Sequence, residues 1–146
     1  IRARAMLIQV LFRLHGLPTI CSESILQSAV AAELIRHLIL GGTLESAVDP
    51  IVNKIQPAYK AIFATILSDD WNPTEWSELS NGKAVVCLAQ ALWAVRTTSS
   101  FEDAIVAAVD LGDDADTVAA VTGAIAGAKY GIQQIPARWV TYFESG

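Results

Sequence analysis

The fold class is decided by residues 100–131, which read SFEDAIVAAVDLGDDADTVAAVTGAIAGAKYG. Ser99 or Ser100 can cap a helix over 101–109, and a second helix is expected over 117–130. Both segments are apolar at helical spacing, and only a short polar stretch separates them. The sequence therefore predicts two helices joined by a tight acidic loop.

The same pattern of helix caps and breakers extends through the rest of the chain. Further helices are expected over 3–14, 24–40 (with Ser24 opening a capping box), 44 onward (disturbed by Pro50), 57–67, 83–95 and 136 onward. No convincing alternating pattern of strands occurs. We therefore predict a single all-α domain over 1–146, built as a compact multi-helix orthogonal bundle.

Composition excludes several classes of function. The chain has 146 residues, 53% of them apolar, which is enough for a hydrophobic core. Its formal charge is −5 with only ten Lys and Arg, so binding to nucleic acid or to an anionic membrane is not expected. Charges interrupt every apolar run before the length of a membrane span.

Cysteine usage points to a reducing compartment. Cys21 and Cys87 each lie in an apolar helical pattern and form no CxxC pair, so both are predicted to be buried thiols. A cytoplasmic protein is the resulting expectation. The chain starts at Ile1 inside a helical pattern, and we interpret it as a piece of a longer protein.

The acidic loop carries the main chemical signal. Asp113, Asp114 and Asp116 place three carboxylates within four residues, and such a cluster needs a cation or strong donors nearby. In a locally extended backbone the side chains of Asp114 and Asp116 point the same way, and Thr117 adds a hydroxyl oxygen. An all-oxygen ligand set suits Mg²⁺, Mn²⁺ or Ca²⁺ better than zinc.

A structural alternative stays open for this loop, because an aspartate at a helix start can simply cap it and favour its dipole. An EF-hand is excluded, since Ile125 occupies the position where its final carboxylate is required. Downstream, Gly123, Gly127 and Gly131 form a bare stripe, which favours close helix packing over ligand approach.

The order and spacing of several motifs resemble the C-terminal part of the ADP-ribosylglycohydrolase family, including the dinitrogenase reductase-activating glycohydrolases. The motifs are Ala89-Gln90-Ala91-Leu92-Trp93-Ala94, Ser100-Phe101-Glu102-Asp103-Ala104, the Asp114-Ala115-Asp116-Thr117 segment with its flanks, the glycine stripe, and Ile135-Pro136-Ala137-Arg138-Trp139. The resemblance is strongest over 80–143.

The resemblance implies specific site residues. Asp114, Asp116 and Thr117 would bind magnesium, or manganese, as part of a two-metal centre. The Asn81-Gly82 turn would line the substrate cleft. Asp113 stands where the family commonly has glycine, so it is given no ligand role. The implied activity is metal-dependent hydrolysis of the glycosidic bond between ADP-ribose and a protein side chain. Arginine is the first candidate for that side chain.

The chain also departs from the family pattern. The N-terminal glycine-rich helix and the Thr-Asp-Asp-type motif, where catalytic carboxylates are usually placed, do not occur in the expected order. Ser68-Asp69-Asp70 is the nearest imitation, and a surface turn is its ordinary interpretation. The catalytic residues are therefore unassigned, and an upstream half or a second subunit could supply them. The alternative function is a truncated, non-catalytic binding or interaction domain of the same fold.

Overall fold

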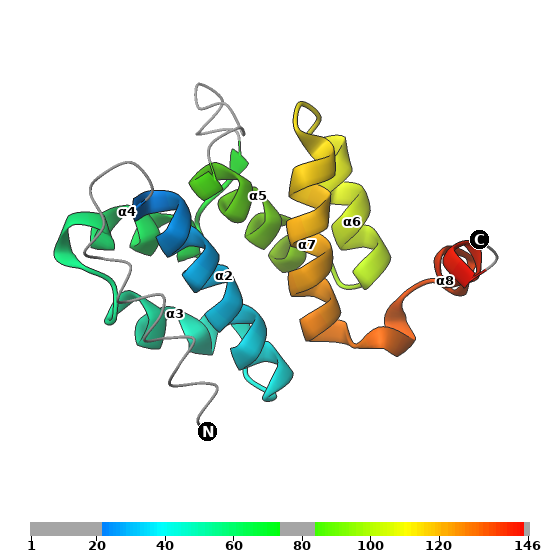
Figure 1. The fold of residues 1–146 in the computed structure, drawn as a ribbon, viewed down its shortest axis with the longest axis horizontal. Coiled ribbons are helices and arrows are strands. Elements are labelled where there is room, and N and C mark those ends of the chain that lie inside the picture. The colour runs from blue at the N-terminus through cyan, green and yellow to red at the C-terminus, as the bar shows by residue number, and fades with distance from the viewer. Residues whose placement is uncertain (1–21, 74–83, 145–146) are drawn as a thin grey trace.

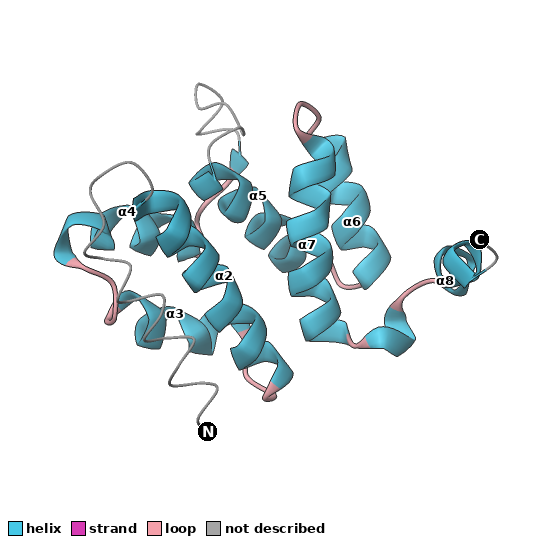
Figure 2. Ribbon diagram, viewed as in Figure 1, coloured by secondary structure: helices cyan, strands magenta, loops and turns pink. Residues whose placement is uncertain are grey.

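A computed structural model describes residues 22–73 and 84–144 of the chain. Within these ranges every regular element is a helix, which confirms the all-α prediction (Figure 2). None of the described helices is both long and apolar enough to cross a bilayer. The elements are α2 (Ser22–Ile39), α3 (Leu44–Val52), α4 (Pro57–Leu67), α5 (Ala84–Thr97), α6 (Phe101–Asp110), α7 (Ala115–Tyr130), the 3₁₀ turn η3 (Ile132–Gln134) and α8 (Ala137–Glu144).

The central element is α5, which packs against α2 and α4 on one side and against α6 and α7 on the other (Figure 1). A helix that is apolar around its whole circumference is typical of a buried position. The buried side chains of α5 are Val85, Val86, Cys87, Leu88, Ala89, Ala91, Leu92, Ala94 and Val95. The core of the domain is therefore built around this one helix.

α2 shows the one-sided pattern of a helix that covers a core. Leu26, Val30, Leu34 and Leu38 recur every fourth residue and are all buried. The predicted cap at Ser24 is wrong, because α2 already includes Ser22. The predicted end at the glycine pair is confirmed, because the N–H groups of Gly41 and Gly42 bond to carbonyls of the last turn of α2.

The corner between α2 and α3 begins with a Schellman motif. Gly41 has a left-handed φ of 87°, its N–H donates to the Leu38 carbonyl, and the Gly42 N–H donates to the His37 carbonyl at 3.0 Å. Thr43 then caps α3 with a full capping box: its hydroxyl accepts from the Ser46 N–H, and the Ser46 hydroxyl accepts from the Thr43 N–H. The predicted Thr43 cap is thus confirmed.

Prolines mark the next two helices. Pro50 lies inside α3, which continues for only two residues beyond it, to Val52. A proline so close to the end removes one backbone hydrogen bond and little else. Pro57 occupies the first turn of α4 as predicted, where its missing N–H has no helical partner in any case.

The segment after α4 is held by Arg96 of α5. The Arg96 guanidinium donates to the carbonyls of Leu67 and Ser68 and pairs with Asp69 at 3.2 Å. Burial lowers the pKa of Arg96, opposed by the charge of Asp69. Trp71 is only 4% exposed and lies in the core. These contacts fix the chain directly after α4.

α6 and α7 form the predicted helical pair, and α8 lies beyond α6 (Figure 1). Ser100 caps α6 by accepting from the Asp103 N–H. The Trp139 ring meets the Phe101 ring edge-on, with centroids 6.1 Å apart, and Arg138 pairs with Glu102. These two contacts attach α8 to the start of α6.

The glycine stripe of α7 faces α6 as expected for helix packing. A Cβ on Gly123 would meet Ile105 at 3.5 Å, and one on Gly127 would meet Phe101 at 3.9 Å. These are ordinary contact distances, so an alanine would fit at either position. Gly131 is a glycine for a different reason, because it ends α7 with a left-handed φ of 82°.

Candidate metal centre

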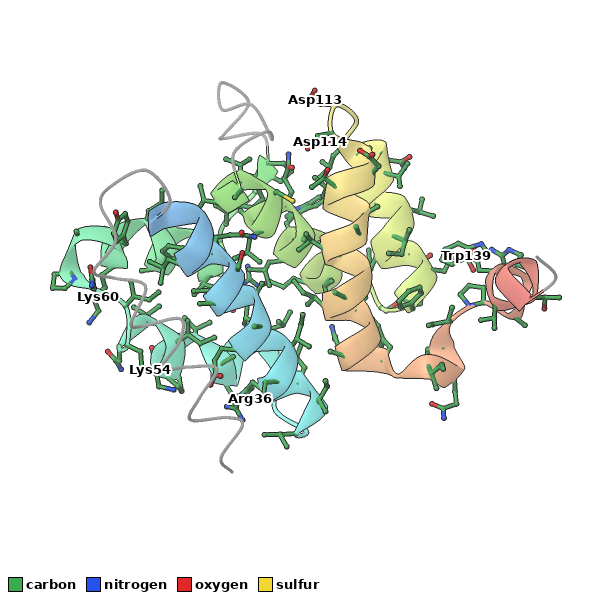
Figure 3. All side chains as sticks on the ribbon, in the orientation of Figure 1. Arg36, Lys54, Lys60, Asp113, Asp114 and Trp139 are labelled. Atoms are coloured by element: carbon green, nitrogen blue, oxygen red, sulfur yellow. The ribbon has the colours of Figure 1, made fainter. Side chains whose placement is uncertain are left out.

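The candidate metal loop, residues 111–117, comprises the link from α6 to α7 and the first residues of α7, at the top of the view in Figure 3. Gly112 and Asp113 both take a left-handed backbone, with φ of 72° and 54°. Such a conformation favours glycine and is tolerated by aspartate. This gives a physical reason why glycine suits the position of Asp113.

Asp114 turns the chain into α7. The Ala115 N–H donates to the Asp113 carbonyl at 2.8 Å, and the Asp114 φ and ψ of −77° and 51° are those of an inverse γ-turn. Asp114 occupies the N-cap position, yet its side chain makes no capping hydrogen bond. The structural alternative of a side-chain cap is therefore not what the structure contains.

The side chain of Asp114 meets Thr117 instead. The Thr117 hydroxyl donates to Oδ1 of Asp114 across 2.8 Å. Neighbouring oxygens in an octahedral Mg²⁺ shell, with metal–oxygen bonds of about 2.0–2.1 Å, lie about 2.9 Å apart. The separation of 2.8 Å is that of an ordinary O–H···O hydrogen bond, and it also leaves the two oxygens close enough to bind one ion.

Asp116 lies in the first turn of α7 and is exposed. Because α7 begins at Ala115, the backbone between Asp114 and Asp116 is not extended, and that reason for grouping their side chains is wrong. The structure brings the side chains of Asp114 and Thr117 into contact. Asp116 lies on the same first turn of α7. No group of three or more His, Cys, Asp or Glu side chains in the described ranges could hold a metal.

An apolar cluster that contains Cys87 lies next to the candidate metal loop. Cys87 is a free, buried thiol in one core cluster with Val118, at the first turns of α5 and α7. Burial, and then the negative charge of Asp114, raise the pKa of Cys87 to about 11. The sequence predicted the buried thiol but gave no sign that it lies near the acidic loop. The prediction for Cys21 concerns a residue outside the described part.

The Ser68-Asp69-Asp70 segment lies at the other end of α5. Asp69 pairs with Arg96, and Arg96 follows Cys87 by nine residues, which is about 13 Å along a helix. The Asp70 N–H donates to the Ser68 hydroxyl, as in an ordinary turn. These aspartates therefore do not complete the site of Asp114. Asn81 and Gly82 lie outside the described residues, and their substrate role stays a prediction.

Comparison with known proteins identifies the class. A profile of the ADP-ribosylglycohydrolase family matches residues 9–145, a wider span than the stretch of strongest resemblance. The chain belongs to that family. No solved structure matches it.

Two relatives are similar over most of the chain. It is 37% identical over 128 residues to the ADP-ribosylarginine hydrolase Tri1 of Serratia proteamaculans, covering 86% of the chain and 34% of that protein. It is 36% identical over 146 residues to Tri1 of Pseudomonas putida, covering 89% and 38%. The bovine ADP-ribosylhydrolase ARH3 is 46% identical over 75 residues, covering 43% and 20%. The chain thus spans about a third of the length of these Tri1 relatives.

Proposed function

We propose that this chain supplies one side of a hydrolase site that cleaves the glycosidic bond between ADP-ribose and a protein arginine. The observation that carries the proposal is the oxygen pair of Asp114 and Thr117, 2.8 Å apart at the exposed start of α7. Arginine is favoured because the relatives that match most of the chain are named ADP-ribosylarginine hydrolases.

Asp114, Asp116 and Thr117 would hold a Mg²⁺ or Mn²⁺ ion of a two-metal centre. When bound, such an ion stabilises negative charge on ribose hydroxyls and lowers the pKa of bound water. Thr117 would then turn its hydroxyl hydrogen away from Asp114 and offer a lone pair. Hydrolysis adds water across the bond from the ribose anomeric carbon to the arginine nitrogen, releasing ADP-ribose and free arginine.

The chain's own contribution is to position these oxygens. The left-handed residues Gly112 and Asp113 reverse the backbone, and the γ-turn at Asp114 aims α7 back along α6. The Val118 N–H donates to the Asp114 carbonyl at 3.1 Å, which fixes the loop to the first helical turn. A rigid first turn keeps ligand geometry within the narrow tolerance that Mg²⁺ requires.

The remaining ligands and the catalytic carboxylates would come from an upstream part of the domain, or from a second subunit. Two carboxylates and a hydroxyl make only half of an octahedral shell. The partner is an ADP-ribosylated protein or ADP-ribose, and the free thiol of Cys87 suits a reducing compartment such as the cytoplasm.

The test compares the 146-residue chain alone with the same chain joined to the upstream part of the Serratia relative. ADP-ribose release from ADP-ribosyl-arginine should need both parts and Mg²⁺, and calorimetry should find weaker than micromolar Mg²⁺ binding by the chain alone. Robust turnover by the chain alone would overturn the half-site. Magnesium-independent turnover by the joined protein would overturn the role of the loop.

The alternative is a binding module of the same fold without catalysis. Under this alternative ADP-ribose would bind to the joined protein, and no release from ADP-ribosyl-arginine would follow at any metal concentration.

A further inference from the structure

The negative charge of the chain is concentrated next to the candidate metal loop. Residues 101–120 contain six of the fifteen carboxylates, at 102, 103, 110, 113, 114 and 116, and none of the ten Lys and Arg. The rest of the chain has nine carboxylates against ten Lys and Arg, a formal charge of +1. The whole net charge of −5 therefore comes from α6, the loop and the first turns of α7.

The outer face of α6 is exposed and mixed in character. Asp103, Val106, Val109 and Asp110 recur three and four residues apart, so they share one side of the helix. Val106 and Val109 are each 47% exposed, whereas Phe101, Ala104 and Ala108 on the opposite side are buried. We call Asp103, Val106, Val109, Asp110 and Asp113 the α6 ridge. It leads along the helix to the loop that carries Asp114 (Figure 3).

The start of α6 already binds a segment with the complementary chemistry. The guanidinium of Arg138 pairs with Glu102, and the neighbouring Trp139 packs its ring against Phe101. A carboxylate of α6 outside the ridge thus already pairs with a guanidinium, whereas the Trp139 contact is to Phe101 on the buried side of the helix. The pairing with Arg138 offsets charge at the start of α6, so the acidic character is strongest towards the loop.

We infer that the α6 ridge docks the protein that carries the modified arginine, and that it selects a basic surface with an apolar side chain. This inference rests on the proposed function, because arginine modified on its guanidinium remains a cationic group beside the site. A ridge with aspartates around two exposed valines attracts further Lys or Arg by charge and retains the apolar contact by burial.

The experiment measures binding of the 146-residue chain to a fluorescent peptide by anisotropy. The peptide carries three unmodified arginines and two apolar residues, and a second peptide replaces each arginine with neutral, isosteric citrulline. We expect the arginine peptide to bind at 50 mM salt and to weaken at 300 mM, as screening predicts. The citrulline peptide should bind at least tenfold more weakly.

Matched variants separate the ridge from net charge. Asp110→Asn with Asp113→Asn should weaken arginine-peptide binding about three- to tenfold, the range for two exposed ion pairs. Asp49→Asn with Asp70→Asn removes the same charge from exposed sites on α3 and after α4, and should change binding less than twofold. Val106→Ser with Val109→Ser should weaken binding of both peptides about threefold.

Equal weakening by the two aspartate pairs would overturn the ridge, because only net charge would then matter. A chain dimer in sedimentation that the valine variant dissociates would show a second copy on this face and overturn the inference as well. The peptides carry no ADP-ribose and the assay needs no turnover. The joined protein could therefore be inactive and still bind the peptide in a way that the ridge variants weaken. That result would contradict the proposed hydrolase function and support the docking surface.

Discussion

Two corners of this domain are built to the same plan and end in different states. At the α2–α3 corner and at the α6–α7 loop, a helix ends at a left-handed glycine, Gly41 or Gly112, and a polar residue starts the next helix. At the first corner, Thr43 caps α3 with its side chain. At the second, Asp114 occupies the same position and does not cap with its side chain.

The difference lies in where the polar groups are directed. The Ser46 hydroxyl donates to the Thr43 carbonyl and accepts from the Thr43 N–H, so its remaining lone pair accepts from Nε2 of His37 at 2.7 Å. His37 is thus a donor in a structural network. In the candidate metal loop the oxygens of Asp114 and Thr117 are paired at an exposed edge. Both corners are exposed, but the first bonds its side chains to the backbone of the helix start, and the second bonds two side-chain oxygens to each other.

The largest expected effect is on activity and comes from a substitution beside the α6–α7 loop. In the joined, active protein, Asp116→Ala should lower turnover by about a hundredfold or more, because it removes a proposed ligand. Asp116 is exposed, so the melting temperature should change little. Asp49→Ala, at an exposed site on α3, is the control and should retain activity. Full activity of the Asp116 variant would remove this residue from the site.

The next effect is on stability and comes from a substitution in the α2–α3 corner. A Cβ on Gly42 would lie 2.2 Å from the His37 ring, so Gly42→Ala must displace the ring and its bond to Ser46. We expect a loss of about 1–2 kcal/mol in the free energy of unfolding, measured by urea denaturation. Gly123→Ala, which meets Ile105 at 3.5 Å, is the matched control and should not destabilise the fold. A His37→Ala background should reduce the cost of Gly42→Ala, and additive costs would contradict the clash.

A pair of identical substitutions compares the two corners directly. Thr43→Ala removes the α3 cap and should cost about 1 kcal/mol. Thr117→Ala removes an exposed hydroxyl at the start of α7 and should stay within about 0.5 kcal/mol without metal. Urea denaturation of both variants gives the difference. Equal costs would mean that the loop, too, relies on side-chain capping.

The smallest effect concerns the strained residue of the loop. Asp113→Gly relieves a φ of 54° and should stabilise the fold by about 0.5 kcal/mol or less, since glycine also gains freedom in the unfolded chain. Gly41→Ala, with a φ of 87°, should instead destabilise it. Thermal denaturation measures both shifts. A destabilising Asp113→Gly would indicate that this carboxylate makes a contact of its own.

Local chemistry made much of the fold predictable. The Thr43 cap, Pro57 in a first turn, the Ser100 cap and the glycine ends depend on neighbours within five residues, and all four are confirmed. The expected helix over 3–14 and the Asn81-Gly82 turn lie outside the described residues, so those predictions stay untested.

Features that depend on distant parts of the chain were not predictable. The burial of Trp71 and the Arg96 bonds to Leu67 and Ser68 join residues about thirty positions apart, and no local pattern encodes them. In the candidate site, the ligand roles of Asp114, Asp116 and Thr117 stay predictions, whereas the left-handed Asp113 and the γ-turn at Asp114 became visible only in the backbone. The reason for grouping Asp114 with Asp116 failed because the helix starts earlier than predicted.

The position of α5 has a consequence for how this protein can change over generations. The α2–α3 corner and the α6–α7 loop lie at the bottom and the top of the view in Figure 1, with the buried α5 between them. Energetic effects at sites so far apart add rather than interact. A mutation in the loop should therefore change the free energy of unfolding by the same amount whatever residues occupy the α2–α3 corner, so the two sites can vary independently of each other.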